Sequence, residues 1–356
     1  MKQYILKRLL LIIPTILGAG ILVFFLMRII PGDICLVRWV DYGTDLDPKL
    51  LELCRNELGL NKPILSQFLD FLIGVFSFDL GDSMWTEQPI IEEIKLRFAL
   101  SLQVAIMTII LVIVISIPLG TISAIKQGSW IDYLIQIFSI AGVAIPSFWL
   151  GILVILGLLI LSQSWLGDPW MPPIHYVSIF SDPITNLSQL IWPALVTGYR
   201  YSAVTTRMTR SALLEVLRTD YIIAARAKGL FKTLIIKRHA LRNAILPIIT
   251  IISMELSFFM GGLVITEQVF NLNGLGRLLV DSVLLSDYNM IQALTMLIAT
   301  IYIVINFAVD LIYAYLDHVS GIVSFQKYFW HFISFVSYLL LSFYIKFNKF
   351  VWCIVI

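Results

Sequence analysis

Long apolar runs constrain this chain more than any other feature of its sequence. The first extends from Leu9 to Ile30, about the 20 residues that an α-helix needs to cross the hydrocarbon of a bilayer. Of the 356 residues, 59% are hydrophobic and only 13% are charged. A soluble core cannot absorb so much apolar sequence, so we expect an all-α polytopic membrane protein.

The first apolar run follows the basic residues Lys2, Lys7 and Arg8. A cleaved signal peptide would have a shorter apolar core and a small-residue cleavage site, and neither is seen. We therefore expect residues 1–30 to form an uncleaved first span with its amino terminus in the cytoplasm.

Residues 31–98 form a polar segment in which acidic residues outnumber lysine and arginine. The positive-inside rule favours an external position for it, as a small folded domain with amphipathic helices over residues 50–58 and 64–76. Cys35 and Cys54 lie in this segment and could pair in an oxidising compartment, although unpaired thiols are the expectation. With Cys353 they form no metal-spaced set.

The core over residues 99–317 contains further apolar runs and one strongly basic loop. The predicted spans are residues 99–125, 133–161, 190–206, 244–265 and 291–316. Prolines in the first five spans of the chain, which bend membrane helices, are Pro14, Pro118, Pro146, Pro193 and Pro247. The loop over residues 207–243 carries nine basic residues against Glu215 and Asp220, so we expect it in the cytoplasm.

A short helix is predicted inside this basic loop. Asp220 is expected to cap a helix over Tyr221–Lys228, and Gly229 to end it in a left-handed conformation. Ile222 and Ala225 share a face at helical spacing, where small residues let another surface approach closely. The pattern indicates a docking helix, although a basic helix on anionic headgroups is an alternative.

Two full charges fall inside predicted spans, Arg200 and Glu255. An unpaired charge at that depth costs roughly 3 kcal/mol or more, so we expect the two to pair. The alternative is that one of them lines a polar conduit. Asp310 and Asn306, nearer the inner end of the last core span, are expected to pack and to form hydrogen bonds.

The sequence offers no catalytic chemistry of its own. It contains no phosphate-cradling G-x-x-x-x-G-K-[ST], no G-x-S-x-G and no H-E-x-x-H, and its four histidines are scattered. Gly274-Leu275-Gly276 lacks the third glycine of a dinucleotide site. We expect no catalytic or metal-binding residue, and any energy for transport must come from a partner.

The basic loop resembles the coupling loop of ABC importer permeases of the peptide/nickel branch. The resemblance rests on Asp220-Tyr221-x-x-x-Ala225-Arg226-Ala227-Lys228-Gly229-Leu230 and on Arg238-His239-Ala240-Leu241-Arg242-Asn243-Ala244 with Pro247. Further landmarks are Pro31-Gly32-Asp33, Asp79-Leu80-Gly81-Asp82-Ser83, Pro146-Ser147-Phe148-Trp149 and Gly274-Leu275-Gly276-Arg277-Leu278. It covers the chain from Met1 to about Asp317.

This resemblance implies a six-span type I importer domain in the bacterial inner membrane. It implies a homologous second permease, separate ABC ATPase subunits that hold ATP and Mg²⁺, an external solute-binding protein and surrounding lipid, with no nucleic acid and no cofactor on this chain. The residues implied to couple to the ATPase are Asp220, Tyr221, Ala224, Ala225, Arg226, Ala227, Lys228 and Gly229. Those implied to bracket the coupling helix are Arg238, His239, Arg242, Asn243 and Pro247.

The chain departs from the family pattern at several positions. Ile223-Ala224-Ala225 replaces the Glu-Ala-Ala of the wider motif, and Arg242 stands where that motif has proline. Asn273 replaces a proline before Gly-Leu-Gly and is expected to loosen that external turn. The match stops after Asp317, so residues 318–356 are either a seventh span near 328–345 or replaced, non-native sequence, which we favour.

Two other function classes compete with an importer permease. One is a secondary transporter that needs no partner, and the other is a membrane scaffold whose basic loop binds lipid. Neither requires a short helix ended by glycine, so the coupling motif favours the permease, while the transported substrate stays open.

Overall fold

The structure is a computed structural model that describes residues 2–29, 35, 48–57, 59–77, 79–166 and 176–316. Both alternatives for the tail over residues 318–356 lie outside these residues. The described part is helical, with one isolated β-bridge between Asp82 and Pro89. The all-α prediction is therefore confirmed for it.

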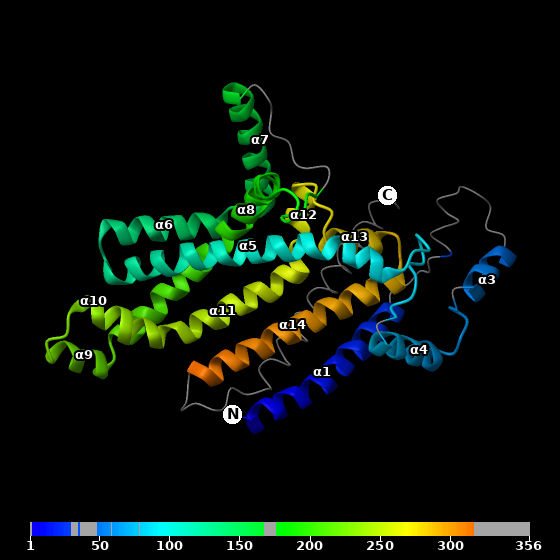
Figure 1. Ribbon diagram of the computed structural model, residues 1–356, viewed down its shortest axis with the longest axis horizontal. Coiled ribbons are helices and arrows are strands. Elements are labelled where there is room, and N and C mark those ends of the chain that lie inside the picture. Colours follow the sequence, from blue (N-terminus) through cyan, green and yellow to red (C-terminus); the bar gives the residue numbers. More distant parts are fainter. Residues whose placement is uncertain are drawn as a thin grey trace. The chain divides into compact units, whose positions relative to one another are not determined.

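The helices are labelled as in Figure 1. Their bounds are α1 Lys2–Ile29, α3 Pro48–Glu57, α4 Ile64–Ser77, α5 Ile90–Ile125, α6 Trp130–Ala144, α7 Ser147–Leu166, α8 Pro183–Leu217, α9 Asp220–Ala227, α10 Lys232–Leu234, the π-helix η1 Ile235–Ala240, α11 Leu241–Gly262, α12 Val264–Val269, α13 Leu275–Leu284 and α14 Tyr288–Leu316.

The chain divides into two compact units, Met1–Thr15 with Asp310–Ile356, and Ile16–Val309. In the first unit, Arg8 Nη1 lies 2.9 Å from Asp310 Oδ2, and both side chains are largely buried. A buried charge needs such a partner because leaving water is costly. Asp310 is thus an ion-pairing residue, beyond the packing and hydrogen bonding expected of it.

The second unit is built around α5 and α8, which pack along each other, with α6 and α11 against α8 (Figure 1). Leu100, Val104, Leu190, Phe259 and Phe270 belong to its buried apolar cluster. Helix α8 begins where Asp182 accepts hydrogen bonds from the backbone N–H groups of Ile184 and Thr185. This satisfies amides of the first turn that have no partner within the helix.

The predicted span over residues 133–161 is not one continuous helix. It is divided between α6 and α7, with Ile145 in an extended conformation at φ −79° and ψ 122°. Pro146 explains the break, because proline lacks an N–H and its ring disfavours a helical conformation for the residue before it. Of the five prolines expected inside spans, this one separates two helices, while the other four lie within α1, α5, α8 and α11.

Five helical segments of the described chain are long and apolar enough to cross a membrane. They are Arg8–Phe25, Ile90–Ile125, Ser147–Ser164, Lys232–Phe259 and Tyr288–Ile312. The predicted span over residues 190–206 lies in α8, which is not among these five, so a count of six stays a prediction. Helices α5 and α8 contain 36 and 35 residues, or about 50 Å each, and so exceed the hydrocarbon thickness of about 30 Å.

The segment after the first span contains two amphipathic helices close to their predicted bounds, α3 and α4. Helix α4 packs against α1 through Phe24, whose ring lies 5.2 Å from that of Phe68 and 5.9 Å from that of Phe71. Cys35 and Cys54 form a disulfide, with Cα atoms 6.0 Å apart, so the expectation of unpaired thiols is wrong. The fold brings the two cysteines within bonding range, which their sequence positions do not indicate.

Candidate functional site

The short helix predicted in the basic loop is present as α9, but its amino-terminal cap differs from the prediction. The residue at the N-cap is Thr219, and no side chain caps this end. The Thr219 hydroxyl instead donates to the carbonyl oxygen of Val216 at 2.6 Å. Asp220 is the first helical residue, where its negative charge still suits the positive end of the helix dipole.

The carboxyl end of α9 is closed by backbone hydrogen bonds around Gly229. The N–H of Gly229 donates to the Arg226 oxygen at 3.0 Å, and the N–H of Leu230 donates to the Ala225 oxygen at 3.4 Å. This is the Schellman pattern, which requires a left-handed residue. Gly229 has φ +77°, as the sequence predicts. The helix therefore ends at a defined residue.

The inner face of α9 packs on the chain's own helices. Ile222 is fully buried in a cluster with Leu213 of α8 and Ala124 of α5, and Ala225 packs against the same cluster. The prediction that a partner docks on the Ile222 and Ala225 face is therefore wrong. That face holds α9 to the bundle, because burying apolar side chains stabilises the contact.

The segment after α9 completes this attachment. Helix α10 continues through η1 into α11, and Ile235, Ala240 and Ala244 from this stretch belong to the cluster that contains Ile222. The side-chain amide of Asn243 donates to the Tyr221 hydroxyl at 2.7 Å. The structure thus brings one predicted bracket residue onto one predicted coupling residue.

The other predicted bracket residues lie on the same continuous stretch. Arg238 is exposed and His239 is half-buried on η1, while Arg242 and Pro247 are exposed on α11. The basic side chains therefore lie on the outside of the segment, and its apolar side chains carry the packing.

The outer face of α9 and the turn after it expose apolar side chains. Exposed fractions are 54% for Ile223 and 83% for Phe231, and Tyr221, Leu230 and Leu234 are also exposed. The predicted coupling residues Ala224, Arg226, Ala227 and Lys228 lie on the same short segment. We call the exposed residues Tyr221, Ile223, Ala224, Leu230, Phe231 and Leu234 the α9 surface. Figure 1 shows α9 at the end of the α5, α8 and α11 bundle opposite α12 and α13.

An ion pair that the sequence reasoning missed lies at this same end, with its carboxylate buried and its guanidinium partly exposed. Arg210 on α8 donates from Nε and Nη2 to the two oxygens of Asp132 on α6, both at 2.9 Å. Asp132 also accepts from the Ser123 hydroxyl on α5 and from the Gly128 N–H. The Arg210 guanidinium holds the pKa of the Asp132 carboxyl well below its usual range. In the sequence, the only indication of this pair was Asp132 itself, an acidic residue near the start of a helix that follows Lys126.

The predicted pair of Arg200 and Glu255 does not form. Glu255 is 6% exposed and accepts from the Thr205 hydroxyl at 2.7 Å, while its second oxygen has no hydrogen-bond partner. Arg200 is exposed on α8. One side chain is buried and the other exposed, because the rotation of each helix about its axis, and not depth alone, decides what a side chain meets.

A second buried carboxylate, also missed, organises the opposite end of the bundle. Glu267 of α12 accepts from the Ser101 hydroxyl and from the N–H of Arg277, both at 2.8 Å. A side chain at Gly274 would clash with this carboxylate, which explains the first glycine of Gly274-Leu275-Gly276. Burial raises the pKa of Glu267, and the hydrogen bond from the Arg277 N–H opposes the rise.

The turn before that glycine is held by a side chain. The Asn273 side-chain oxygen accepts from Arg97 Nε at 3.1 Å, although the sequence predicted that asparagine would loosen this turn. A side-chain hydrogen bond to a neighbouring helix here supplies a restraint that proline would supply through its ring.

The described residues contain no cluster of three or more histidine, cysteine or acidic side chains that could hold a metal ion. The geometry instead defines a multi-pass helical membrane protein with a short, firmly attached helix that presents an exposed apolar surface. Its class is that of the multi-pass helical membrane proteins.

Comparison with known proteins identifies the family of this protein. A family model described as "Binding-protein-dependent transport system inner membrane component" matches residues 116–319, and the corresponding amino-terminal model matches residues 1–105. The chain belongs to this family of ABC importer permeases. It is therefore a non-catalytic, multi-pass inner-membrane permease subunit, and its family works with a separate ATPase, a second permease and a solute-binding protein.

Curated relatives are similar to this chain over most of its length. The glutathione transport system permease protein GsiC of Pectobacterium atrosepticum is 36% identical over 318 residues, covering 88% of this chain and 97% of that protein. The dipeptide transport system permease protein DppB of Escherichia coli is 36% identical over 333 residues, with the same coverage. GsiC of Escherichia coli is 35% identical over 318 residues, again with the same coverage.

Proposed function

We propose that this chain forms half of the translocation pathway of an ATP-driven importer for dipeptides, glutathione or a related small peptide. The cargo class is supported by the relatives, which are named as dipeptide and glutathione permeases. The observation that carries the coupling role is the attachment of α9, whose inner face is buried in the bundle while its outer face is apolar and exposed.

The attachment supports a mechanical route from an ATPase to the long helices. Ile222 packs with residues of α5, α8, η1 and α11, so a displacement of α9 bears on four elements at once. Packed interiors transmit such shifts because they are dense and resist compression. The Asp132–Arg210 pair ties α6 to α8 at the same end. ATP and Mg²⁺ act on the partner ATPase, which contributes the energy.

Orientation and partner surfaces follow from this proposal. The amino terminus and the loop over residues 207–243 lie in the cytoplasm, and residues 31–98 lie outside, where the solute-binding protein docks. The homologous permease covers the exposed apolar side of α7, which includes Trp149, Leu156 and Ile160. Helices exposing so much apolar surface require either lipid or a protein partner.

The α9 surface is tested by placing a charge on it. Phe231→Asp should abolish binding of the cognate ATPase subunit and peptide uptake, because a buried, unpaired carboxylate opposes docking. Phe180→Asp is the matched control, since Phe180 is 96% exposed in the segment before α8 and far from α9 in sequence. Normal ATPase binding by Phe231→Asp, or equal loss in both variants, would overturn the proposal.

The structure also decides which alanine is informative. Ala225 packs against the Ile222 cluster, so Ala225→Glu would disturb this chain's own packing. Ala224 is exposed, and Ala224→Glu therefore tests the partner contact alone. We expect Ala224→Glu to leave the thermal unfolding temperature unchanged while it weakens ATPase binding.

A further inference from the structure

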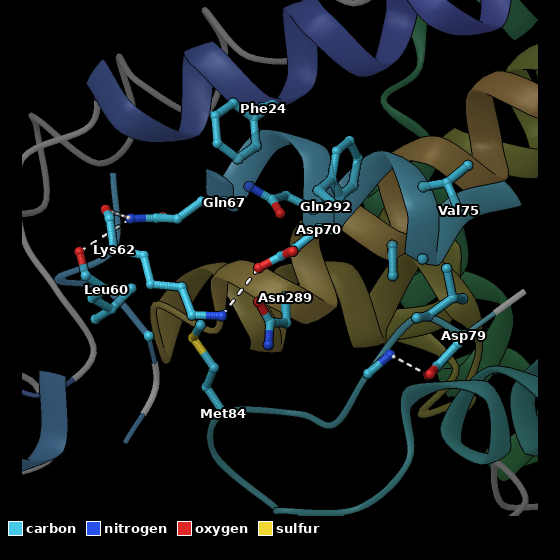
Figure 2. A pocket seen from close by; sticks show the side chains of 16 residues that line it. Phe24, Leu60, Lys62, Gln67, Asp70, Val75, Asp79, Met84, Asn289 and Gln292 are labelled. Atoms are coloured by element: carbon cyan, nitrogen blue, oxygen red, sulfur yellow. Dashed lines mark hydrogen bonds and ion pairs between the residues drawn. The ribbon is translucent and has the colours of Figure 1, made fainter. Parts of the chain in front are cut away.

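A pocket of about 240 Å³ lies at the side of the bundle that carries α4 (Figure 2). Its walls come from the end of α1, from residues 59–62, from α4, from residues 79–84 and from the first turns of α14. Pockets for drug-sized ligands usually measure roughly 300–1,000 Å³. This pocket therefore suits a smaller molecule, or one end of a longer one.

A buried amide without a partner lines the pocket. Gln292 of α14 is 5% exposed, and its Nε2 group has no hydrogen-bond partner among the described residues. Gln292 and Asp70 both line this pocket (Figure 2). Buried polar groups are nearly always hydrogen-bonded, so this N–H group is a donor that calls for a ligand acceptor such as a carbonyl or carboxylate oxygen.

The charges on the walls favour a cationic group beside that acceptor. Lys62 Nζ lies 3.1 Å from Asp70 Oδ2, and both side chains are 57% exposed at the pocket's rim. Asp79 is the third charged residue of the lining, so the two carboxylates outnumber the single ammonium. Asp70 uses one oxygen for Lys62, which leaves the other to accept from a ligand ammonium.

The remaining wall is apolar. Phe24, Phe71 and Val75 face the same space and form a surface for a small hydrophobic side chain. The Phe24 and Phe71 rings lie 5.9 Å apart, so this part of the wall is held by aromatic packing.

We propose that this pocket binds the amino-terminal residue of a short peptide. The ligand ammonium contacts Asp70, its first carbonyl oxygen accepts from Gln292 Nε2, and its side chain packs against Phe24 and Phe71. A phosphoethanolamine headgroup also offers an ammonium, but its phosphate would lie beside two carboxylates, which disfavours it. The site needs neither ATP nor a second subunit, so it is independent of the proposed import function.

The experiment is calorimetric titration of the full chain in phosphatidylcholine nanodiscs, without ATPase or binding protein. L-alanyl-L-alanine should bind saturably with one site, and its N-acetyl derivative, which lacks the ammonium, should not bind. Gln292→Met and Asp70→Asn should each weaken binding about tenfold or more, since the first removes a buried hydrogen-bond donor and the second removes the charge that pairs with the ligand ammonium. Gln189→Met is the matched control, because Gln189 also has an unpaired buried amide oxygen but lies on α8 outside the pocket.

The possible results of this titration distinguish a peptide site from a lipid-headgroup site and from no site. Absence of saturable binding by the unmodified chain, or equal binding of the acetylated peptide, would overturn the site. Tighter binding of O-phosphoethanolamine than of the dipeptide would assign the pocket to a lipid headgroup and overturn the peptide assignment. Asp70 is exposed, so Asp70→Asn decides the matter even if Gln292→Met fails to fold. Peptide uptake with no binding here would leave the import function intact and remove only this site.

Discussion

The left-handed glycine that ends α9 provides a test of how the coupling helix works. Gly229 has φ +77°, and a methyl group added to it would meet no other atom within 4 Å, so Gly229→Ala adds backbone strain without a clash. A left-handed conformation costs a residue with a side chain roughly 1 kcal/mol or more. If that strain is relieved by fraying of α9, the equilibrium constant between the docking-competent helix and the frayed state falls about fivefold.

The expected result is that ATPase affinity for the permease falls measurably, by up to that same factor of about five, because only the folded α9 binds. Gly229→Pro should cost more, roughly 3 kcal/mol or a factor of about 100, since proline cannot reach this φ and loses the N–H that donates to Arg226. The assay is titration of the purified ATPase subunit onto the permease in nanodiscs, alongside peptide uptake.

A second glycine supplies the matched control. Gly128 has φ +78°, also has no atom within 4 Å of an added side chain, and lies in the turn before α6. Gly128→Ala should lose a similar amount of stability and leave ATPase affinity unchanged. The reasoning is refuted if the two alanine variants weaken ATPase binding equally, or if Gly229→Pro binds normally.

Three further predictions concern the buried polar groups. Asp132→Asn should lower the free energy of unfolding by about 3 kcal/mol, because it leaves the partner guanidinium without its carboxylate. The lowered pKa of Asp132 means that its contribution is present above its ordinary value of 3.8 and is lost as pH falls below it, which acid unfolding measures. Gly274→Ala should destabilise by about 3 kcal/mol through its clash, whereas Gly157→Ala, in open space on α7, should not. Arg200→Ala and Glu255→Ala should have effects on stability that add within about 0.5 kcal/mol.

Each of these three predictions has a result that would contradict it. Unfolding of Asp132→Asn at the unmodified temperature would show that the ion pair contributes nothing. Equal stability of Gly274→Ala and Gly157→Ala would mean that the carboxylate of Glu267 moves away from the added methyl group. A coupling energy above about 1 kcal/mol between Arg200→Ala and Glu255→Ala in a double-mutant cycle would show that the two charges interact, as the sequence predicted.

Much of the architecture was predictable because it depends on local sequence. Apolar runs of membrane length give the helices, and the excess of basic residues marks the loop over residues 207–243. Gly229 ended α9 as predicted, since a left-handed helix end is a property of a few consecutive residues. Pro146 carried an equally local signal, and it breaks the predicted span over residues 133–161 into two helices where the sequence predicted a bend.

The coupling helix α9 shows which features could be predicted from the sequence and which could not. By itself the sequence determined that the chain is a helical membrane protein and that a short helix ends at Gly229, because hydropathy and backbone conformation act over one turn or one span. Only the tertiary structure decided that Ile222 faces inward while Ile223 faces outward, that Arg210 pairs with Asp132, and that Glu255 accepts a hydrogen bond from Thr205. Successive residues on a helix project about 100° apart, so the packing of distant segments, which fixes the rotation of each helix, decides what each side chain meets.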